Sequence, residues 1–412
     1  MNATRRPAPR VASTRAARSA GHSGDGLRID AAERRVVCDN ATGAGPADVT
    51  RTRITLPSSF DFAWMRRFLL LRRVPSLETW SDDTYVRMLC IDNGPAAVVA
   101  GASHAIADAV RDDGRAGTGR GTRGAELAIT LTIRHRGSAP PSRVSTTTAA
   151  ERAWLDVTCA PALSNGPALS NGPALPSAIV RALVTRMFDL DADLDAFAAH
   201  VRRDRIMGPL VRQRPYVRLP RVIDPFEGLV RAMLGQQVTV RAAGTMTDRL
   251  VRRFGTPLAT PLNGLSNAIG TMAAESLFSF PRPEAIVRAG DDGLRSIGLT
   301  RAKAAAIVTL ADEIASQRLD WTRLATLASD DVHAALVALP GIGPWTASYV
   351  CMRVLGHRDA FPAADLGVIK ALEALGVPRA EHVAVAERWR PWRGYATLHL
   401  WESLASASTG GD

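Results

Sequence analysis

A glycine-rich turn between two apolar segments contains the residues best placed to do chemistry. It runs Leu339-Pro340-Gly341-Ile342-Gly343-Pro344-Trp345-Thr346-Ala347. The pattern predicts that one helix ends at Leu339 and that the next begins at Pro344, because proline is favoured in a first helical turn. The amides of Gly341, Gly343 and Thr346 would then point outward at a helix N-terminus, which is an anion site suited to a DNA phosphate. By itself the motif is equally typical of an ordinary turn.

An aspartate lies downstream of this turn, in Phe361-Pro362-Ala363-Ala364-Asp365. Asp365 precedes the apolar segment Leu366–Leu375 and is therefore also a good helix N-cap. The two interpretations agree, because the N–H donors at the start of a helix favour a negative charge. A Gly/Pro hairpin followed by a Pro…Asp segment resembles the signature of the helix-hairpin-helix/GPD glycosylase superfamily.

The resemblance extends over residues 54–404 and points to the bacterial DNA-3-methyladenine glycosylase II family. The similar blocks are Phe60–Arg73 with Ser76–Thr79, Asp224–Gly255, Leu294–Ala311, Leu339–Asp365 and Ala386–Trp401. It implies a monofunctional DNA glycosylase for base excision repair. Such an enzyme flips out alkylated purines, such as 3-methyladenine and 7-methylguanine, and hydrolyses the N-glycosidic bond.

The same resemblance gives roles to individual residues. Asp365 would be catalytic, as a general base or as an electrostatic stabiliser of oxocarbenium-like charge on the sugar. An aromatic pocket would attract a cationic base by cation–π contacts, with walls from Trp345, Tyr349, Trp401, Phe60 and Phe68. Without the resemblance, Trp345 and Tyr349 at helical spacing would indicate ordinary core packing. We keep that interpretation for Trp389 and Trp392.

DNA contacts are expected from two segments, the hairpin and a glutamine pair. The residues are Gly341, Gly343, Thr346, Gln236, Gln237 and Arg241. Gln237 stands where the best-known family member has a leucine that fills the gap left by the extruded base, and a glutamine could also hydrogen-bond the orphan partner. Leu366 stands where that member has a tyrosine, so the pocket loses one aromatic wall and its substrate range stays open.

The scarcity of lysine bears on strand cleavage. Bifunctional relatives carry a lysine at the position of Trp345, because a Schiff base needs an amine. The only lysines are Lys303 and Lys370, so we predict base removal without AP-lyase activity. The cysteines lie too far apart for an iron–sulfur cluster, a zinc finger or a disulfide scaffold; they are Cys38, Cys90, Cys159 and Cys351. We expect no cofactor and no metal site, although the hairpin carbonyls could hold a structural monovalent or divalent cation.

The charge of the chain indicates the kind of partner. Its 412 residues carry a net charge of +11, and all but two of the 51 Lys and Arg residues are arginine. A GC-rich genome explains why arginine is preferred to lysine, but it does not explain the excess of basic over acidic residues. That excess is strong between Val201 and Arg253, where there are twelve arginines and four acids. We expect double-stranded DNA containing alkylated bases as the partner. The sequence has no run of 18 apolar residues, which is the length that would predict a membrane span. We expect a monomer in the bacterial cytoplasm, associated with the chromosome.

These residues must be positioned by helices and strands, and the sequence predicts an α+β fold in three parts. Residues 1–50 indicate a disordered basic arm, although their acid-free start also imitates a mitochondrial transit peptide. Residues 51–190 predict an N-terminal α+β domain with an antiparallel sheet and flexible insertions near 101–124 and 137–176. Residues 191–412 predict an all-helical glycosylase core. Its subdomains are the hairpin-bearing 222–359 and a second one made of 191–221 plus 360–412.

Periodicity gives the elements of each part. The first ordered part should contain helices over Phe60–Arg73 and Ile179–Phe188, with strands over Tyr85–Asp92, Ala96–Ala100, Glu126–His135 and Trp154–Thr158. The helices expected in the second part are Asp193–Arg203, Asp224–Gln236, Val240–Phe254, Pro283–Ala289, Arg301–Ser316, Asp330–Leu339, Pro344–Leu355, Asp365–Leu375, Ala380–Arg388 and Trp392–Leu404.

Two other classes of protein stay open from the residues alone. A catalytically silent helix-hairpin-helix DNA-binding module would need neither Asp365 nor the aromatic set, and release of free base from methylated duplex DNA separates it from an enzyme. A methyl-acceptor repair protein would need a reactive cysteine, as in a Pro-Cys-His run. None of the four cysteines lies in such a run.

Overall fold

The computed structural model describes residues 49–91, 127–137, 153–161, 175–257 and 277–407. The expected arm, the insertion near 101–124 and the expected strand Ala96–Ala100 lie outside these residues, apart from the last two residues of the arm. The second expected insertion, 137–176, is interrupted by a strand at Trp154–Pro161. All the described residues belong to one compact unit, and the proposed subdomain boundaries stay predictions.

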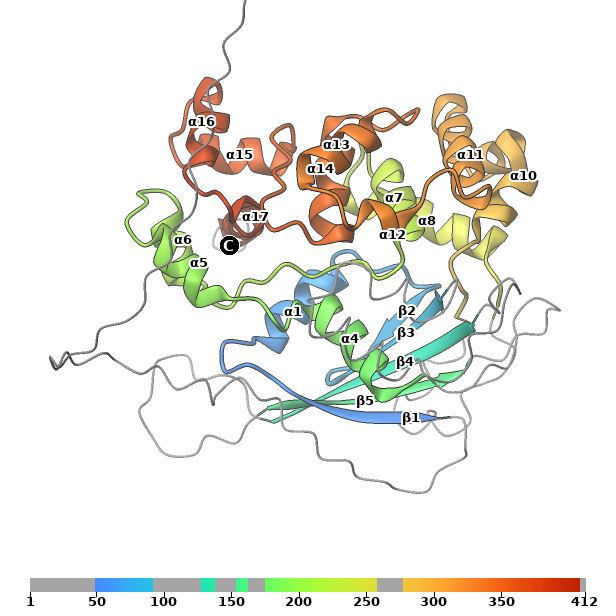
Figure 1. The fold of residues 1–412 in the computed structure, drawn as a ribbon, viewed down its shortest axis with the longest axis horizontal. Helices are drawn as coiled ribbons and strands as arrows, with labels where there is room; N and C mark the ends of the chain where they lie inside the picture. Colours follow the sequence, from blue (N-terminus) through green and yellow to red (C-terminus); the bar gives the residue numbers. More distant parts are fainter. Residues whose placement is uncertain (1–48, 92–126, 138–152, 162–174, 258–276, 408–412) are drawn as a thin grey trace, which may run out of the picture. The chain divides into compact units, whose positions relative to one another are not determined.

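The fold is α+β as predicted, with one antiparallel sheet followed by helices (Figure 1). The sheet order is β1-β5-β4-β3-β2. The strands are β1 (Thr50–Thr55), β2 (Glu78–Trp80), β3 (Thr84–Ile91), β4 (Leu127–Arg136) and β5 (Trp154–Pro161). β3, β4 and β5 were predicted. β1 and β2 were not, because they are short edge strands with little apolar alternation.

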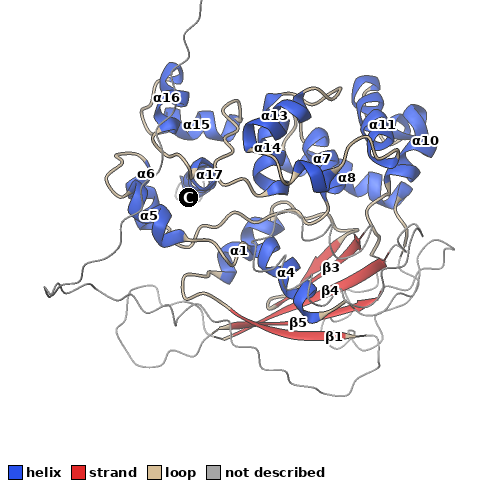
Figure 2. Ribbon diagram, in the orientation of Figure 1, coloured by secondary structure: helices blue, strands red, loops and turns tan. Residues whose placement is uncertain are grey.

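The inner face of the sheet is set by the alternation in β4. Ile129, Leu131 and Ile133 are fully buried and pair with Leu89, Arg87 and Tyr85 of β3, respectively. The helices α1 (Phe62–Leu70) and α4 (Ser177–Phe188) lie between the sheet and the remaining helices (Figure 2). The register therefore directs one charged side chain, Arg87, into an otherwise apolar interior.

Arg87 is paired inside this interior. Its guanidinium donates to both carboxylate oxygens of Glu227 on α7 (Pro225–Leu234) and, at 3.2 Å, to Glu78. Glu227 also accepts from Arg231 at 2.8 Å. Burial alone would raise the pKa of Glu227, but the Arg87 and Arg231 guanidiniums hold it below its usual range. This ion-pair network joins the sheet to the first helix of the hairpin-bearing region.

The second half of the chain is helical in every described segment apart from an isolated β-bridge between Pro257 and Phe278. Its helices are α5 (Leu194–Val201), α6 (Met207–Gln213), α7, α8 (Val240–Phe254), α10 (Pro283–Ser296), α11 (Arg301–Ala315), α12 (Trp321–Leu324), α13 (Ser329–Val337), α14 (Pro344–Val350), the π-helical turn η3 (Cys351–Leu355), α15 (Leu366–Ala374), the 3₁₀ turn η4 (Arg379–Glu381), α16 (His382–Glu387) and α17 (Arg393–Ala407). The sequence missed α6 and α12, which are short. It also ended α10 too early, at the kink made by Gly290 with φ of +61°.

A buried histidine gives this core a predictable acid sensitivity. His399 on α17 is 1% exposed, and burial lowers the pKa of its imidazole to about 3. The unfolded chain takes up a proton at this residue below about pH 6.5, whereas the folded chain does not. The folded-state pKa is therefore depressed, and stability is lost as the pH falls from about 6.5 towards 3.

We expect His399→Gln to remove this dependence. Between pH 7 and pH 5, the free energy of unfolding of the wild type should fall by ~2 kcal/mol more than that of the variant. Urea denaturation at both pH values measures the difference. The exposed His200 supplies the control His200→Gln, which should follow the wild type. Parallel pH profiles for wild type and His399→Gln would contradict the prediction.

Candidate active site

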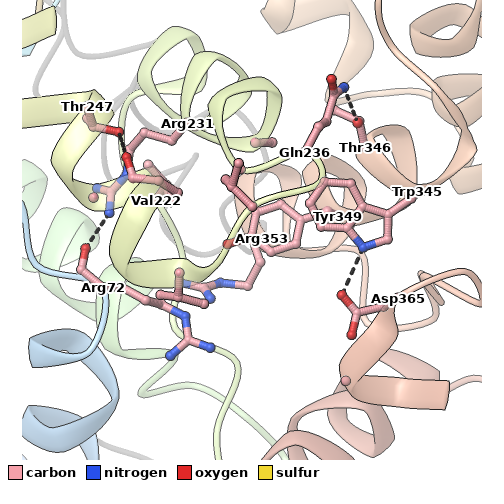
Figure 3. Close-up of a pocket in the computed structure, with 18 of the residues that line it drawn as sticks. Arg72, Val222, Arg231, Gln236, Thr247, Trp345, Thr346, Tyr349, Arg353 and Asp365 are labelled. Carbon is pink, nitrogen blue, oxygen red and sulfur yellow. Dashed lines mark hydrogen bonds between the residues drawn. The ribbon is translucent and has the colours of Figure 1, made fainter. Parts of the chain in front are cut away.

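A cavity of about 1230 Å³ opens beside the hairpin and extends inward toward the sheet. Its walls come from the end of α1, from α7 and the turn that follows it, from α14 with η3, from the start of α15, and from α17. Figure 3 shows Trp345, Tyr349 and Asp365 on one side, with Arg353 and Arg72 further in. The cavity thus gathers most of the candidate residues named from the sequence.

Asp365 lies in this cavity with both carboxylate oxygens bound. Oδ2 accepts from the Trp345 indole N–H at 2.8 Å, and Oδ1 accepts from the Trp401 indole N–H at 2.8 Å. Oδ1 also accepts from the Val368 amide at 3.0 Å, so Asp365 is the N-cap of α15, as its position in the sequence predicts. Three N–H donors therefore hold one carboxylate in a single orientation.

The aromatic residues form a continuous group around the carboxylate. The Trp345 and Tyr349 ring centroids are 5.5 Å apart, and those of Tyr349 and Trp401 are 6.3 Å apart. All three residues line the cavity. The indoles have a role that the sequence did not reveal, because they position Asp365 as well as offering ring faces.

Gly367 permits the close approach of Trp401 to α15. A Cβ at this position would lie 2.9 Å from Trp401 Cδ1 and 3.0 Å from Asp365 Oδ1. Both neighbours belong to the hydrogen-bonded group at the cavity. Any side chain here must therefore displace that group.

We expect Gly367→Ala to lower the rate of base release roughly tenfold, because displaced catalytic groups lose their alignment. The global fold should persist, since alanine has a higher helix propensity than glycine. Single-turnover release of 7-methylguanine measures the effect. The control is Lys370→Ala, on an exposed position of the same helix. Equal rates for both variants would show that the contact with Trp401 is irrelevant.

The hairpin joins α13 to α14 as the sequence predicts. Gly341 has φ of +76°, and a Cβ there would lie 2.5 Å from Ala306 Cβ, so only glycine fits this turn. Gly343 lines the cavity, and Pro344 begins α14. Thr346 is 1% exposed, and its hydroxyl accepts from Gln236 at 2.9 Å. Its side chain is therefore engaged with the turn that follows α7.

The two glutamines take different places. Gln236 donates to Gly341 O and to Thr346 Oγ1, both at 2.9 Å, and so ties the turn after α7 to the hairpin. Gln237 is exposed and has φ of +59°, an uncommon backbone for a residue other than glycine. Lys303 of α11 donates to Leu234 O at 3.2 Å and to Gln236 O at 3.0 Å, and these bonds hold the turn in place. Sequence reasoning missed this lysine because it acts on backbone far away in the chain.

Two of the expected pocket residues, Phe60 and Phe68, do not line the cavity. Phe60 is 5% exposed and packs on Phe188, with centroids 6.2 Å apart, and it does not line the cavity. Phe68 is 7% exposed and lies behind the cavity wall, with the Arg72 guanidinium 3.8 Å from its ring centroid. The expectation that both wall the pocket is therefore wrong. Arg241 is exposed in the first turn of α8, and Leu366 is 67% exposed at the cavity.

The packing of two tryptophans follows the prediction. Trp389 is 0% and Trp392 is 7% exposed, and neither lines the cavity.

A group of arginines in the cavity was missed by sequence reasoning. Arg72, Arg231 and Arg353 all line it. Burial raises the pKa of the Tyr349 phenol, but Arg353, Arg72 and Arg231 outweigh this effect and hold that pKa below its usual value. Burial and then the neighbouring Arg353 lower the pKa of Arg72 to about 10, so its guanidinium is still charged at neutral pH. The inner part of the cavity is therefore electropositive.

The described cysteines are poor nucleophiles. Burial raises the pKa of the Cys159 and Cys351 thiols to about 12, so both are protonated at neutral pH. Cys38 and the side chain of Cys90 lie outside the described residues. In the part of the chain that the structure describes, no group of three or more His, Cys, Asp or Glu residues could hold a metal ion. No described helix is long and apolar enough to cross a membrane.

Two protein families match the chain. The AlkA N-terminal domain matches residues 52–224, and the HhH-GPD superfamily base excision DNA repair protein matches residues 230–393. The first match ends at Asp224, the N-cap of α7, and the second begins within α7, after all five strands of the sheet. Together they account for the sheet, the hairpin and Asp365.

Individual relatives agree with these families. A probable bifunctional transcriptional activator/DNA repair enzyme AlkA of Mycobacterium tuberculosis is 37% identical over 53% of this chain, which covers 41% of that relative's length. The DNA-3-methyladenine glycosylase 2 of Escherichia coli is 28% identical over 83% of this chain and 93% of its own length. The DNA-3-methyladenine glycosylase of Bacillus subtilis is 31% identical, over 53% of this chain and 69% of its own length.

A solved structure shares the fold. The 3-methyladenine DNA-glycosylase from Archaeoglobus fulgidus superposes with a TM-score of 0.57 at 21% identity, over 85% of this chain and 96% of that one. The two family matches and the relatives from B. subtilis and E. coli, rather than this shared fold, place the chain in the bacterial DNA-3-methyladenine glycosylase II family of the HhH-GPD superfamily.

Proposed function

We propose that this chain is a monofunctional DNA glycosylase that extrudes alkylated purines, such as 3-methyladenine and 7-methylguanine, and hydrolyses their N-glycosidic bond in base excision repair. The observation that carries the proposal is the Asp365 carboxylate, which two indole N–H groups hold at a cavity beside a DNA-binding hairpin. The proposed activity agrees with the names of the E. coli and B. subtilis relatives.

The cavity has room for a nucleobase removed from the stack. Extrusion costs a few kcal/mol, and stacking on aromatic faces recovers about 1–3 kcal/mol per base. Trp345, Tyr349 and Trp401 supply those faces. A base stacked among them would bring its sugar towards Asp365, because two of the three rings bond that carboxylate.

The bonds that Asp365 already makes limit its role. A carboxylate has about four lone-pair positions. Oδ1 uses two of them, for Trp401 and Val368, and Oδ2 uses one, for Trp345. The remaining position on Oδ2 can orient a single water, while the negative charge stabilises the oxocarbenium-like sugar as the base departs. We therefore propose electrostatic stabilisation as the main role, with water placement through Oδ2 alone.

DNA would be held at two adjacent places. Gly341 lies in the hairpin turn, Gly343 is the N-cap of α14 and Thr346 lies in its first turn. Unpaired N–H groups at a helix start bind phosphate. Gln237, exposed beside them, would fill the gap left by the base, and Arg241 would add a salt-sensitive phosphate contact. The hairpin carbonyls could bind a structural cation.

We further propose that the chain lacks AP-lyase activity and acts as a monomer on double-stranded DNA, at the chromosome in the bacterial cytoplasm. Trp345 occupies the hairpin position at which an attacking amine would be needed. Neither lysine lines the cavity. Lys303 donates to two backbone carbonyls, and Lys370 is exposed on α15.

The test is release of free base from duplex DNA treated with a methylating agent. We expect 3-methyladenine and 7-methylguanine in the supernatant, and an abasic strand that breaks only after alkali. Strand breakage without alkali would contradict the absence of lyase activity. DNA binding without release of any base would instead support the catalytically silent DNA-binding module.

A further inference from the structure

The exposed face of α8 carries a row of arginines that leads away from the turn after α7. The apolar residues Leu250 and Val251 are fully buried and fix the opposite face of the helix in the core. The exposed residues that remain on the solvent side are Arg241, Thr245, Arg249, Arg252 and Arg253. We call this surface the α8 basic face.

Little in the described part of the chain neutralises the α8 basic face. Arg252 is paired with Asp248 at 2.9 Å, and the Ser76 amide donates to the same carboxylate. Arg249 donates only to the weak acceptor Met246 Sδ, at 3.9 Å, and the Arg253 side chain has no hydrogen bond or ion pair among the described residues. A guanidinium carries five N–H groups, so most donors of Arg249 and Arg253 are available to a ligand.

A shallow groove of about 510 Å³ lies between the α8 basic face and the turn that joins α10 to α11. Its lining consists of Arg249, Arg252 and Arg253 with Ser296, Ile297 and Gly298. Gly298 has φ of +103°, and a Cβ there would lie 3.5 Å from Arg249 Nη1, so the turn approaches this guanidinium closely. The groove therefore has cationic donors on one wall and small side chains on most of the other.

The same helices begin beside the turn that the proposed function places in DNA. Lys303 of α11 bonds two carbonyls of that turn, at 3.2 and 3.0 Å. Each neighbouring helix has an exposed arginine in its first turn, Arg241 on α8 and Arg301 on α11. Figure 1 shows α8, α10 and α11 grouped on one side of the fold. The positive surface is therefore continuous with the DNA-binding region rather than separate from it.

We propose that the α8 basic face and the adjoining α10–α11 turn form a second DNA contact, which holds the phosphate backbone of the duplex on one side of the lesion. The inference rests on the proposed function for the place of the turn in DNA, and it adds a surface outside the pocket. Arg241 and Arg253 are separated by ~18 Å along the helix axis, and a duplex has one phosphate per ~3.4 Å of its axis on each strand. The face thus spans several phosphates. Arginine forks suit phosphate oxygens, and such contacts position a duplex without reading its sequence.

The experiment measures the affinity of the full chain for duplexes with flanks of different length. One duplex has about 25 base pairs and a central abasic site, and two shortened ones end about 4 base pairs from that site, on one side or the other. Wild type, Arg249→Gln/Arg253→Gln and Arg249→Lys/Arg253→Lys are compared by fluorescence anisotropy at several salt concentrations.

We expect the glutamine pair to weaken binding to the long duplex ~10-fold and to lower the slope of log Kd against log salt by ~1–2. On one of the shortened duplexes this variant and the wild type should bind equally, because the phosphates that the face contacts are missing there. The lysine pair should keep most of the affinity, since a phosphate contact depends mainly on the charge.

The matched control removes two charges from another part of the fold. Arg203 and Arg205 are exposed between α5 and α6, which Figure 1 shows far from α8. Arg203→Gln/Arg205→Gln changes the net charge by the same amount, and its affinity should stay within ~2-fold of wild type because distant exposed charges are screened.

The inference would be overturned by an unchanged affinity of the glutamine pair at Arg249 and Arg253, or by an equal loss in the control. An equal loss on the long and on both shortened duplexes would also overturn it, because the contact would then lie at the lesion itself. The long duplex with 7-methylguanine in place of the abasic site tests the proposed function separately. A wild type that binds through the α8 basic face but releases no base would overturn the proposed function and leave this contact standing.

Discussion

Asp365→Asn should abolish most of the base release while leaving the fold and the binding of DNA in place. Asparagine keeps the shape of the side chain and is itself a good N-cap for α15. It removes the negative charge, and it places an amide donor against one of the two indole N–H donors of Trp345 and Trp401. We expect a fall of at least ~100-fold in the single-turnover rate with 7-methylguanine, the size seen when a group that stabilises transition-state charge is lost.

The control uses an exposed acid on α13, the first helix of the hairpin. Asp331 is exposed in the first turn of α13, and Asp331→Asn should retain the wild-type rate. Affinity for a duplex with an abasic site, measured by fluorescence anisotropy, should stay within ~3-fold of wild type in both variants, because phosphate contacts do not involve Asp365. An Asp365→Asn variant with full activity would refute the assignment of the active site.

Glu227→Gln should produce the largest loss of stability among single substitutions at buried polar sites. The change leaves Arg87 and Arg231 with one carboxylate fewer inside the protein, although Glu78 still pairs with Arg87. Breaking a buried ion pair from one side costs ~3–5 kcal/mol, because a charge is left without compensation. Urea denaturation at pH 7 measures the free energy of unfolding.

A double-mutant cycle separates this network from general damage. Arg87→Met should also be destabilising, but the double variant Arg87→Met/Glu227→Gln should lose much less than the sum of the two single losses. Strict additivity would show that the buried contact does not couple the sheet to α7. A surface pair, Arg53 with Asp156, gives the matched control. Its disruption should cost less than ~1 kcal/mol.

The part of the site that sequence predicted is the part encoded by neighbours in the chain. The hairpin follows from the local alternation of glycine and proline, and the N-capping place of Asp365 follows from the residues around it. The strands β3 and β4 follow from apolar alternation, which reports burial of one face directly. These features depend on few contacts between distant segments.

The missed features are those made by distant segments. Arg72, Arg231 and Arg353 meet in one cavity from the end of α1, from α7 and from the π-helical turn η3. No local pattern in α1, α7 or η3 marks these three arginines as turned inward. Phe60 was assigned to the pocket by the family resemblance, yet its ring packs on Phe188 of α4. One usable signal was present, since Arg87 occupies an inward position in the alternation of β3.

The turn after α7 is held in place before any DNA arrives. Gln236 fastens it to the hairpin and Lys303 fastens two of its carbonyls. Because the turn is already ordered, it loses little conformational entropy when it enters the DNA, and less of the binding energy is used to order it. Encounter with DNA should then be governed by diffusion and electrostatic attraction, with an association rate that falls as salt rises and shows no slow isomerisation of the turn.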